Sequence, residues 1–182
     1  GVAQDITAHR LEAGRLKGLA ETDALTGLLN RAGFEADLAR RASAGDGPGL
    51  ALLYIDLDHF KPVNDRHGHP VGDQLLRQFA ARLRTLVRPT DAVARLGGDE
   101  FAIVLSGIRE QSHAEAVAAK VVEAAGTAFI VDGLELHIGA CVGLALGVHT
   151  GESVEDLVAR ADAQLYRAKA CGRSRWVAAS SV

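Results

Sequence analysis

The segment that most constrains the fold of this chain is a short, continuously apolar run at residues 50–55, Leu-Ala-Leu-Leu-Tyr-Ile. A run of this length without alternating polar residues is typical of a strand that is covered on both faces. The acidic residues Asp56 and Asp58 begin where the run ends. The sequence therefore predicts a central strand that has helices on both sides of its sheet and carboxylates at its end.

Two further strands are predicted at residues 92–96 and 101–105, on either side of Gly97 and Gly98. Glycine readily adopts positive φ, which suits the turn of a hairpin. Asp99 and Glu100 lie at the tip of this hairpin. Because hairpin strands are antiparallel, much of the sheet is predicted to be antiparallel.

Helical periodicity covers much of the remaining chain. Helices are predicted at residues 26–44, from 71 to a stop at 88–89, at 111–125, and from 153 onward, where Ser153 and Asp156 form a capping box. Residues 128–147 are predicted to form a second hairpin that turns at Asp132 and Gly133. This order predicts an α+β fold, a mostly antiparallel central sheet covered by helices.

At 182 residues the chain suits one domain with a short leader. We assign residues 1–22 to a connecting helix, 23–177 to the domain and 178–182 to a tail. The chain starts at Gly1 and contains no Met, so we expect a fragment of a larger protein.

No apolar run approaches the length of a membrane span, so we expect no membrane contact by this fragment and a cytoplasmic location, in a protein that can be membrane-anchored elsewhere. Cys141 and Cys171 are isolated and are expected to be reduced. The net charge of -3 argues against a nucleic-acid partner.

The two acidic pairs converge if their strands are neighbours. Carboxylates brought together raise one another's pKa unless cations intervene, and ligand sets made only of oxygen favour Mg²⁺ or Mn²⁺. Alternation places Asp56 and Asp58 on one face of the strand, with Leu57 facing away and its carbonyl free to bind metal. Solvated turn residues are the alternative, and spacing alone does not separate the two.

Four motifs occur in order along the chain. They are Asp23-Ala-Leu-Thr-Gly-Leu-Leu-Asn-Arg31, Asp56-Leu-Asp-His-Phe-Lys-Pro-Val-Asn-Asp65, Gly97-Gly-Asp-Glu-Phe101 and Ala161-Asp-Ala-Gln-Leu-Tyr-Arg-Ala-Lys-Ala-Cys-Gly-Arg173. Together they resemble the GGDEF family of diguanylate cyclases. The departures are modest: Ala24 replaces a usual Pro, Ser174 a usual Asn, and Cys141 stands where small hydroxylated residues are common.

The resemblance implies a sheet similar to the palm of nucleotide cyclases and polymerases. It implies a nucleotidyltransferase that condenses two GTP into the second messenger cyclic di-GMP and two pyrophosphates, with two Mg²⁺ or Mn²⁺ ions per active site. The implied metal ligands are Asp56, the Leu57 carbonyl and Asp99, and Glu100 supports the site. Whether Asp99 or a metal-bound water takes the proton stays open.

Further roles follow from the same resemblance. The catalytic set is Asp99, Glu100 and Lys61; the phosphate-binding set is His59, Phe60, Lys61, Lys169 and Arg173; the guanine-reading pair is Asn64 and Asp73. For the basic side chains the alternative is a solvated surface charge. For Asn64 it is a turn residue, and for Asp73 a carboxylate favoured in a first helical turn.

Arg88-Pro-Thr-Asp91 resembles the family's RxxD product-binding site, and a helix stop is the alternative. The product needs two nucleotides that attack each other, so the resemblance also implies a homodimer and an upstream sensor domain. Two other functions remain open. One is a catalytically silent module that binds GTP or cyclic di-GMP and regulates an adjoining domain, and the other is a structural dimerisation segment.

Overall fold

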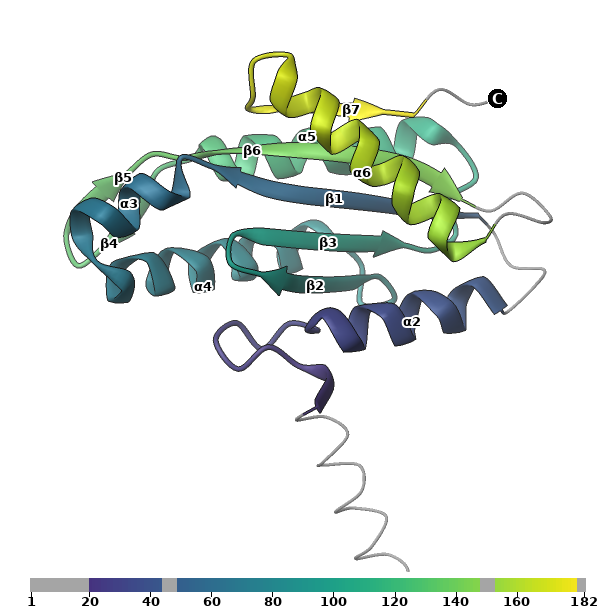
Figure 1. Ribbon diagram of the computed structural model, residues 1–182, viewed down its shortest axis with the longest axis horizontal. Helices are drawn as coiled ribbons and strands as arrows, with labels where there is room; N and C mark the ends of the chain where they lie inside the picture. The colour runs from purple at the N-terminus through teal and green to yellow at the C-terminus, as the bar shows by residue number, and fades with distance from the viewer. Residues whose placement is uncertain (1–19, 44–48, 148–152, 180–182) are drawn as a thin grey trace, which may run out of the picture.

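The structure, a computed structural model, describes residues 20–43, 49–147 and 153–179. Its main sheet has five strands in the order β2-β3-β1-β6-β7 (Figure 1). The strands are β1 (Leu50–Asp58), β2 (Ala92–Gly97), β3 (Glu100–Leu105), β6 (Gly139–Gly147) and β7 (Arg175–Ala178). All neighbouring pairs are antiparallel except β6 and β7. The predicted α+β class and mostly antiparallel sheet are confirmed.

Strand β1 is the central strand, as predicted, but it extends three residues beyond the apolar run, to Asp58. Asp56 pairs in register with Glu100 of β3 and with Cys141 of β6. The acidic end of β1 therefore lies within the paired sheet, where its position is set by two neighbouring strands.

Helices cover both faces of the sheet. One core cluster packs α4 (His69–Leu86) and α5 (Gln111–Gly126) against the β1 face that carries Leu53 and Leu57. A second packs α2 (Arg31–Ser43) and α6 (Val154–Ala170) against the face that carries Leu52. In Figure 1, α6 crosses the sheet toward the viewer and α5 lies behind it. Since strand residues alternate between faces, Asp56 and Asp58 belong to the α6 face.

Several element boundaries differ from the predictions. The hairpin predicted over residues 128–147 ends at residue 136: β4 (Phe129–Val131) and β5 (Leu134–Leu136) form a separate two-stranded sheet that turns at Asp132 and Gly133. The rest of that segment is β6, which is buried along its length and pairs with β1. Its apolar residues are better buried in the centre of the main sheet than in a short outer hairpin.

Helix boundaries also shift. The helix predicted from residue 26 begins at Arg31, because residues 23–30 form a loop stabilised by side-chain hydrogen bonds of Asp23 and Asn30. Helix α3 (Phe60–His67) and strand β7 were not predicted. Gly68, with φ of 84°, separates α3 from α4.

The predicted connecting helix lies mostly outside the described residues, as do the last three residues of the predicted tail. Strand β7 reaches Ala178, the first residue of that tail. Within the described ranges, none of the helices has the length and apolar character to cross a membrane.

Candidate active site at the end of β1

A cavity of about 280 Å³ opens where β1 ends, between the start of α3, the β2–β3 turn and the end of α6. All of the residues that were predicted to bind metal ions or phosphate groups line this cavity. The lining residues are Asp56, Leu57, Asp58, His59, Phe60, Lys61, Pro62, Asp99, Lys169 and Arg173. Glu100, Asn64 and Asp73 do not line it. Residues 56 and 99, which are 43 positions apart in the sequence, thus share one cavity.

Backbone pairing explains how the two acidic segments meet. The Leu57 N–H donates to the Asp99 carbonyl at 3.2 Å, so the hairpin tip is held directly beside the end of β1. Gly97 and Gly98 have φ of 150° and 49°, values that the turn can adopt because these residues lack a Cβ. Asp99 is placed at the cavity by this turn.

The charge of Asp56 affects the neighbouring carboxylate of Asp99. Burial, followed by the charge of Asp56, raises the pKa of Asp99 above its ordinary value of 3.8, and Lys169 and Arg95 offset only part of the rise. Lys169 Nζ lies 2.7 Å from Asp56 Oδ2. Burial acts to lower the pKa of Lys169, but the hydrogen bond and charge of Asp56 outweigh it, so the pKa is raised. The site therefore favours additional positive charge.

This donor set fits a hard divalent cation. Asp56, Asp99 and the Leu57 carbonyl are oxygen donors at one cavity, and a bound cation would offset the charge of Asp56, which together with burial raises the pKa of Asp99. In the part of the chain that the structure describes, no group of three or more His, Cys, Asp or Glu side chains is arranged to hold a metal. A cation here would thus complete its ligand shell with substrate phosphates and water, as is typical of Mg²⁺.

The start of α3 suits an anion. His59 takes a left-handed conformation, φ 63°, that turns the chain from β1 into α3, and its side chain does not cap the helix. The first N–H groups of a helix have no intrahelical partner and attract anions. Because Phe60 and Lys61 line the cavity, these N–H groups lie on the same side as Lys169 and Arg173.

The two residues predicted to read guanine lie on consecutive helices, Asn64 on α3 and Asp73 on α4. Asn64 Oδ1 is buried and has no hydrogen-bond partner among the described residues. Gly72 packs against it so closely that a Cβ there would lie 1.9 Å from Oδ1. A buried, unpaired polar atom calls for an explanation, and a ligand N–H group would satisfy this one.

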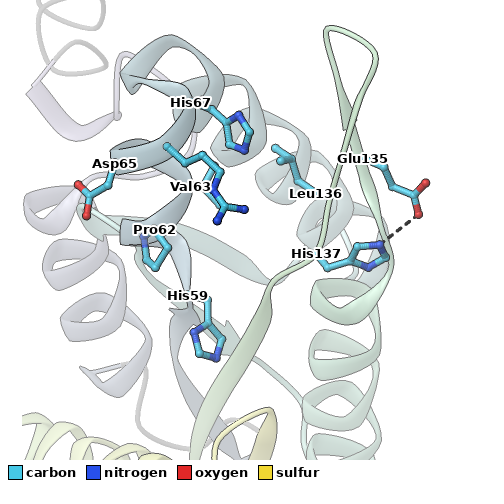
Figure 2. Close-up of a pocket in the computed structure, with 9 residues that line it drawn as sticks. His59, Pro62, Val63, Asp65, His67, Glu135, Leu136 and His137 are labelled. Atoms are coloured by element: carbon cyan, nitrogen blue, oxygen red, sulfur yellow. Dashed lines mark hydrogen bonds and ion pairs between the residues drawn. The ribbon is translucent and has the colours of Figure 1, made fainter.

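A pocket of about 620 Å³ lies between α3 and β5 and shares His59 and Pro62 with the first cavity (Figure 2). The side chains of His67 and His137 approach it from α3 and from the segment after β5, whereas Asp65 points away. His137 Nε2 lies 3.1 Å from Glu135 Oε1. None of the roles predicted for side chains falls on this pocket.

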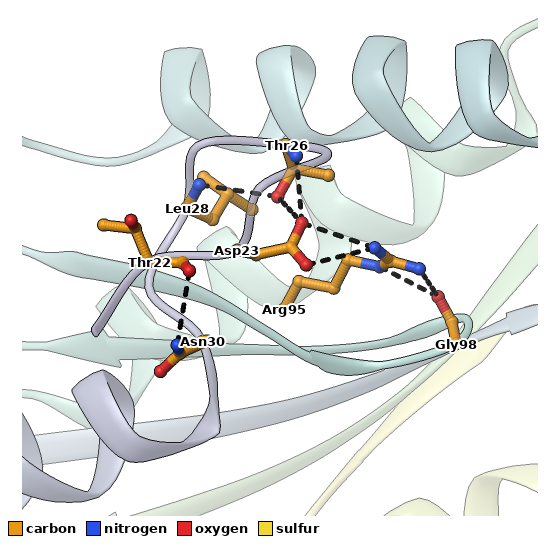
Figure 3. Close-up of polar contacts among 7 residues, drawn as sticks. All are labelled: Thr22, Asp23, Thr26, Leu28, Asn30, Arg95 and Gly98. Carbon is orange, nitrogen blue, oxygen red and sulfur yellow. Dashed lines mark hydrogen bonds and ion pairs between the residues drawn. The ribbon is translucent and has the colours of Figure 1, made fainter. Parts of the chain in front are cut away.

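A network that the sequence reasoning missed joins the first motif to the hairpin tip (Figure 3). The Asp23 carboxylate accepts hydrogen bonds from the N–H and hydroxyl of Thr26, at 2.9 and 2.6 Å, and from Arg95 at 3.2 and 3.3 Å. Arg95 also donates to the Gly98 carbonyl at 2.8 and 3.0 Å. The available signal was an arginine two residues before Gly97, next to the acidic hairpin.

Arg88 and Asp91 line a third pocket, of about 470 Å³, together with Arg41 and Arg84. Asp91 closes the turn after α4, since its carboxylate accepts from the N–H groups of Arg88 at 2.9 Å and Ser106 at 3.0 Å. Helix α4 thus ends just before the segment 88–91, as the helix-stop alternative predicted. Several arginines at one pocket also suit an anionic ligand.

Comparisons with known proteins agree with this geometry. Residues 20–175 match the family described as "Diguanylate cyclase, GGDEF domain". An uncharacterized signaling protein of Caulobacter vibrioides is 41% identical over 173 residues, 93% of this chain and 21% of that protein. The cyclic di-GMP phosphodiesterase NbdA of Pseudomonas aeruginosa is 38% identical over 161 residues, 87% of this chain and 20% of that protein.

A solved structure, the coiled coil and GGDEF domain of DgcB from Caulobacter crescentus in complex with c-di-GMP, superposes with a TM-score of 0.87 at 30% identity. The match covers 98% of this chain and 95% of that one. The α+β fold of this chain is thus shared with a solved GGDEF domain. The chain belongs to the GGDEF diguanylate cyclase domain family. It spans about one fifth of the length of the two curated relatives.

Proposed function

We propose that this domain is a diguanylate cyclase, which condenses two GTP molecules into cyclic di-GMP and two pyrophosphates. The observation that carries the proposal is the shared cavity of Asp56 and Asp99, with the start of α3 and three cationic side chains around it. Such a cavity offers carboxylates for cations and N–H, Lys and Arg donors for a triphosphate. Transfer of a nucleotidyl group requires both kinds of group, carboxylates that bind cations and donors that bind phosphates.

Asp56, Asp99 and the Leu57 carbonyl would hold the Mg²⁺ or Mn²⁺ ions, two per active site, with Glu100 in support. Bound cations would lower the pKa of the attacking hydroxyl and neutralise charge on the α-phosphate and pyrophosphate. The chain itself positions the substrate. The phosphates would be bound beside the carboxylates by three cationic side chains and by two backbone N–H groups. These are the side chains of Lys61, Lys169 and Arg173 and the N–H groups of residues 59 and 60.

Asn64 and Asp73 would read the guanine base. A carboxylate can accept from N1–H and the exocyclic amine of guanine, and the amide of Asn64, whose Oδ1 has no partner among the described residues, would contact the remaining edge of the base. Adenine lacks this pattern of donors, so it would leave these groups unpaired. GTP is accordingly the substrate we infer.

A single cavity holds one nucleotide, while the product joins two. Two domains must therefore face each other around a two-fold axis, and activity depends on this homodimer. An upstream sensor domain would set how often the two sites meet. We place the domain in the cytoplasm, where GTP is available, without nucleic-acid partners and with no membrane contact of its own.

The pocket at Arg88 and Asp91 would bind cyclic di-GMP and restrain the enzyme. The structure of the DgcB domain was solved with c-di-GMP, and the arginines around this pocket suit its phosphates. Asp91 would act here by holding the turn that presents Arg88.

A second candidate is a catalytically silent module that binds GTP or cyclic di-GMP and regulates an adjoining domain. The relation to NbdA, which is named a phosphodiesterase, favours it, since this chain matches only a fifth of that protein. The complete carboxylate cavity argues for the enzyme, because a silent module has no need of Asp99.

The test is incubation of the purified protein at high concentration with GTP and Mg²⁺, followed by identification of products by mass spectrometry. We expect cyclic di-GMP and pyrophosphate from the wild type and none from Asp99→Ala. Nucleotide binding measured by calorimetry without any turnover would instead support the silent module. The absence of both would exclude either role for this domain.

A further inference from the structure

Asp58 is the second carboxylate of β1, two residues from Asp56 and on the same face, yet its surroundings differ from those of Asp56. Only 3% of Asp58 is exposed. A buried carboxylate is strongly destabilising unless hydrogen-bond donors or cations compensate its charge. The groups that compensate the charge of Asp58 therefore indicate its role in the structure.

Several groups of the chain contact Asp58. The Ser174 N–H donates to Oδ2 at 2.8 Å, and the Ser174 hydroxyl lies 3.4 Å from the same oxygen. The Cys141 thiol donates to the two oxygens at 3.3 and 3.4 Å, and Arg173 Nε lies 3.9 Å from Oδ1. Burial and Asp58 together raise the pKa of Cys141 to about 11, so this thiol keeps its proton and remains a donor.

The turn after α6 requires such support. Arg173 and Ser174 both have left-handed backbone conformations, φ 59° and 46°. Each such residue other than glycine costs roughly 1 kcal/mol or more. The Ser174 N–H bond to Asp58 holds the second of them. Gly139 leaves the space for it, because a Cβ there would lie 2.2 Å from Ser174 Oγ.

We propose that Asp58 is a positioning residue, which holds the turn at residues 172–174 so that Arg173 reaches the triphosphate, and that it is not a metal ligand. This inference rests on the proposed function of the cavity. Its geometric basis is that Asp58 is surrounded by donors of the chain, whereas the side chain of Asp56 is 17% exposed and, among the residues that the structure describes, forms an ion pair with Lys169 alone.

The test compares Asp58→Asn with Asp65→Asn, a matched change on the exposed side of α3. The probe is 3′-deoxy-GTP with saturating Mg²⁺, which lacks the attacking hydroxyl and so reports binding alone. Because hydrogen bonds of charged groups contribute about 1.5–3 kcal/mol, we expect Asp58→Asn to weaken calorimetric affinity about tenfold or more. Asp65→Asn should stay within about twofold.

A rescue variant separates positioning from other roles. Glycine adopts a φ of 46° without cost, so Ser174→Gly in the Asp58→Asn background should recover most of the lost affinity. The Mg²⁺ concentration for half-maximal binding should stay unchanged in both variants. A tenfold increase in that concentration, without rescue by Ser174→Gly, would show that Asp58 binds metal and would overturn the proposal.

Amide hydrogen exchange at Ser174 tests the contact without nucleotide. We expect slow exchange in the wild type and in Asp65→Asn, and exchange about tenfold faster in Asp58→Asn, since a neutral amide oxygen is a weaker acceptor. Equal exchange in all three proteins would refute the proposal. If Asp58→Asn does not fold, Gly139→Ala, which displaces Ser174, takes its place in both measurements.

The two proposals fail in different ways. If wild-type protein does not bind 3′-deoxy-GTP, the proposed function fails, while Ser174 exchange still decides whether Asp58 holds the turn. If the wild type binds and Asp58→Asn binds equally well, only the positioning role fails.

Discussion

Lys169 Nζ lies 2.7 Å from Asp56 Oδ2, so the cation at the end of α6 is an internal counter-ion for the carboxylate at the end of β1. The two residues are 113 positions apart in the sequence. Both residues line the cavity together with Asp99, whose pKa is raised by burial and by the charge of Asp56. Four predictions follow from this and related contacts.

Lys169→Met should weaken binding of 3′-deoxy-GTP about tenfold or more, because the substitution removes a charged donor from the cavity and leaves Asp56 without its partner. Calorimetry in saturating Mg²⁺ measures the change. The control is Lys120→Met, an exposed lysine of α5, which should bind as the wild type does. Equal affinity in both variants would mean that Lys169 does not contact the phosphates.

Asp23→Asn should reduce the free energy of unfolding at neutral pH by about 1 kcal/mol, since a partly exposed ion pair with Arg95 contributes modestly. Burial acts to raise the pKa of Asp23, but the hydrogen bonds of Thr26 and the charge of Arg95 lower it below 3.8 overall. A lowered pKa means that this stabilisation is present above pH 3.8 and is lost as the pH falls through the folded-state pKa.

The difference between wild type and Asp23→Asn, measured by urea unfolding, should therefore shrink from about pH 6 to about pH 3. Asp162→Asn, on the exposed side of α6, is the control and should show no such change. A difference that stays constant with pH would mean that the charge of Asp23 does not stabilise the fold. Because Arg95 also donates to Gly98, cyclase activity of Asp23→Asn should fall as well.

Gly72→Ala should destabilise the protein by about 2 kcal/mol, because the new Cβ would lie 1.9 Å from Asn64 Oδ1 and 3.2 Å from the Phe60 ring. The matched control is Gly126→Ala at the end of α5, where nothing lies within 4 Å of the added Cβ. That variant should be as stable as the wild type or more stable by up to about 1 kcal/mol. Thermal unfolding of the two variants measures the change in stability that each substitution causes. Equal changes in the two variants would refute close packing at residue 72.

Asp73→Asn should reduce the preference for GTP over ATP by about 100-fold, because a neutral amide no longer accepts from both guanine donors. Competition binding with 3′-deoxy-GTP and ATP measures the preference, and Asp65→Asn is the control. An unchanged preference in Asp73→Asn would move guanine recognition to other residues.

Several features of the site could be predicted from sequence because they depend on local pattern. The apolar run of β1, the glycine turn before Asp99 and the N-cap at Ser153 are each encoded within a few residues, and each occurs as predicted. The capping hydrogen bond, from the Asp156 N–H to Ser153 Oγ, is 3.1 Å long. The sequence also placed acidic residues at the ends of neighbouring strands.

Other features depend on which strands become neighbours. Strand β6 was predicted as half of an outer hairpin, since residues 128–147 contain one clear turn, but pairing with β1 buries all but one of its nine residues. The partners of Asp58 and Arg95 were missed for the same reason: Cys141, Ser174 and Asp23 lie far away in the sequence.

The sequence by itself determined the class of the fold, the family and the residues with chemistry to offer, because hydrophobic period, turn glycines and motifs act over short distances. Only the tertiary structure decided which of those residues share a cavity and which serve the fold. Asp56 and Asp58 are two positions apart, chemically identical and both at the cavity, yet Asp56 pairs with Lys169 while Asp58 is buried among other donors of the chain. Burial and the identity of neighbours from distant segments make that difference, and neither is a property of local sequence.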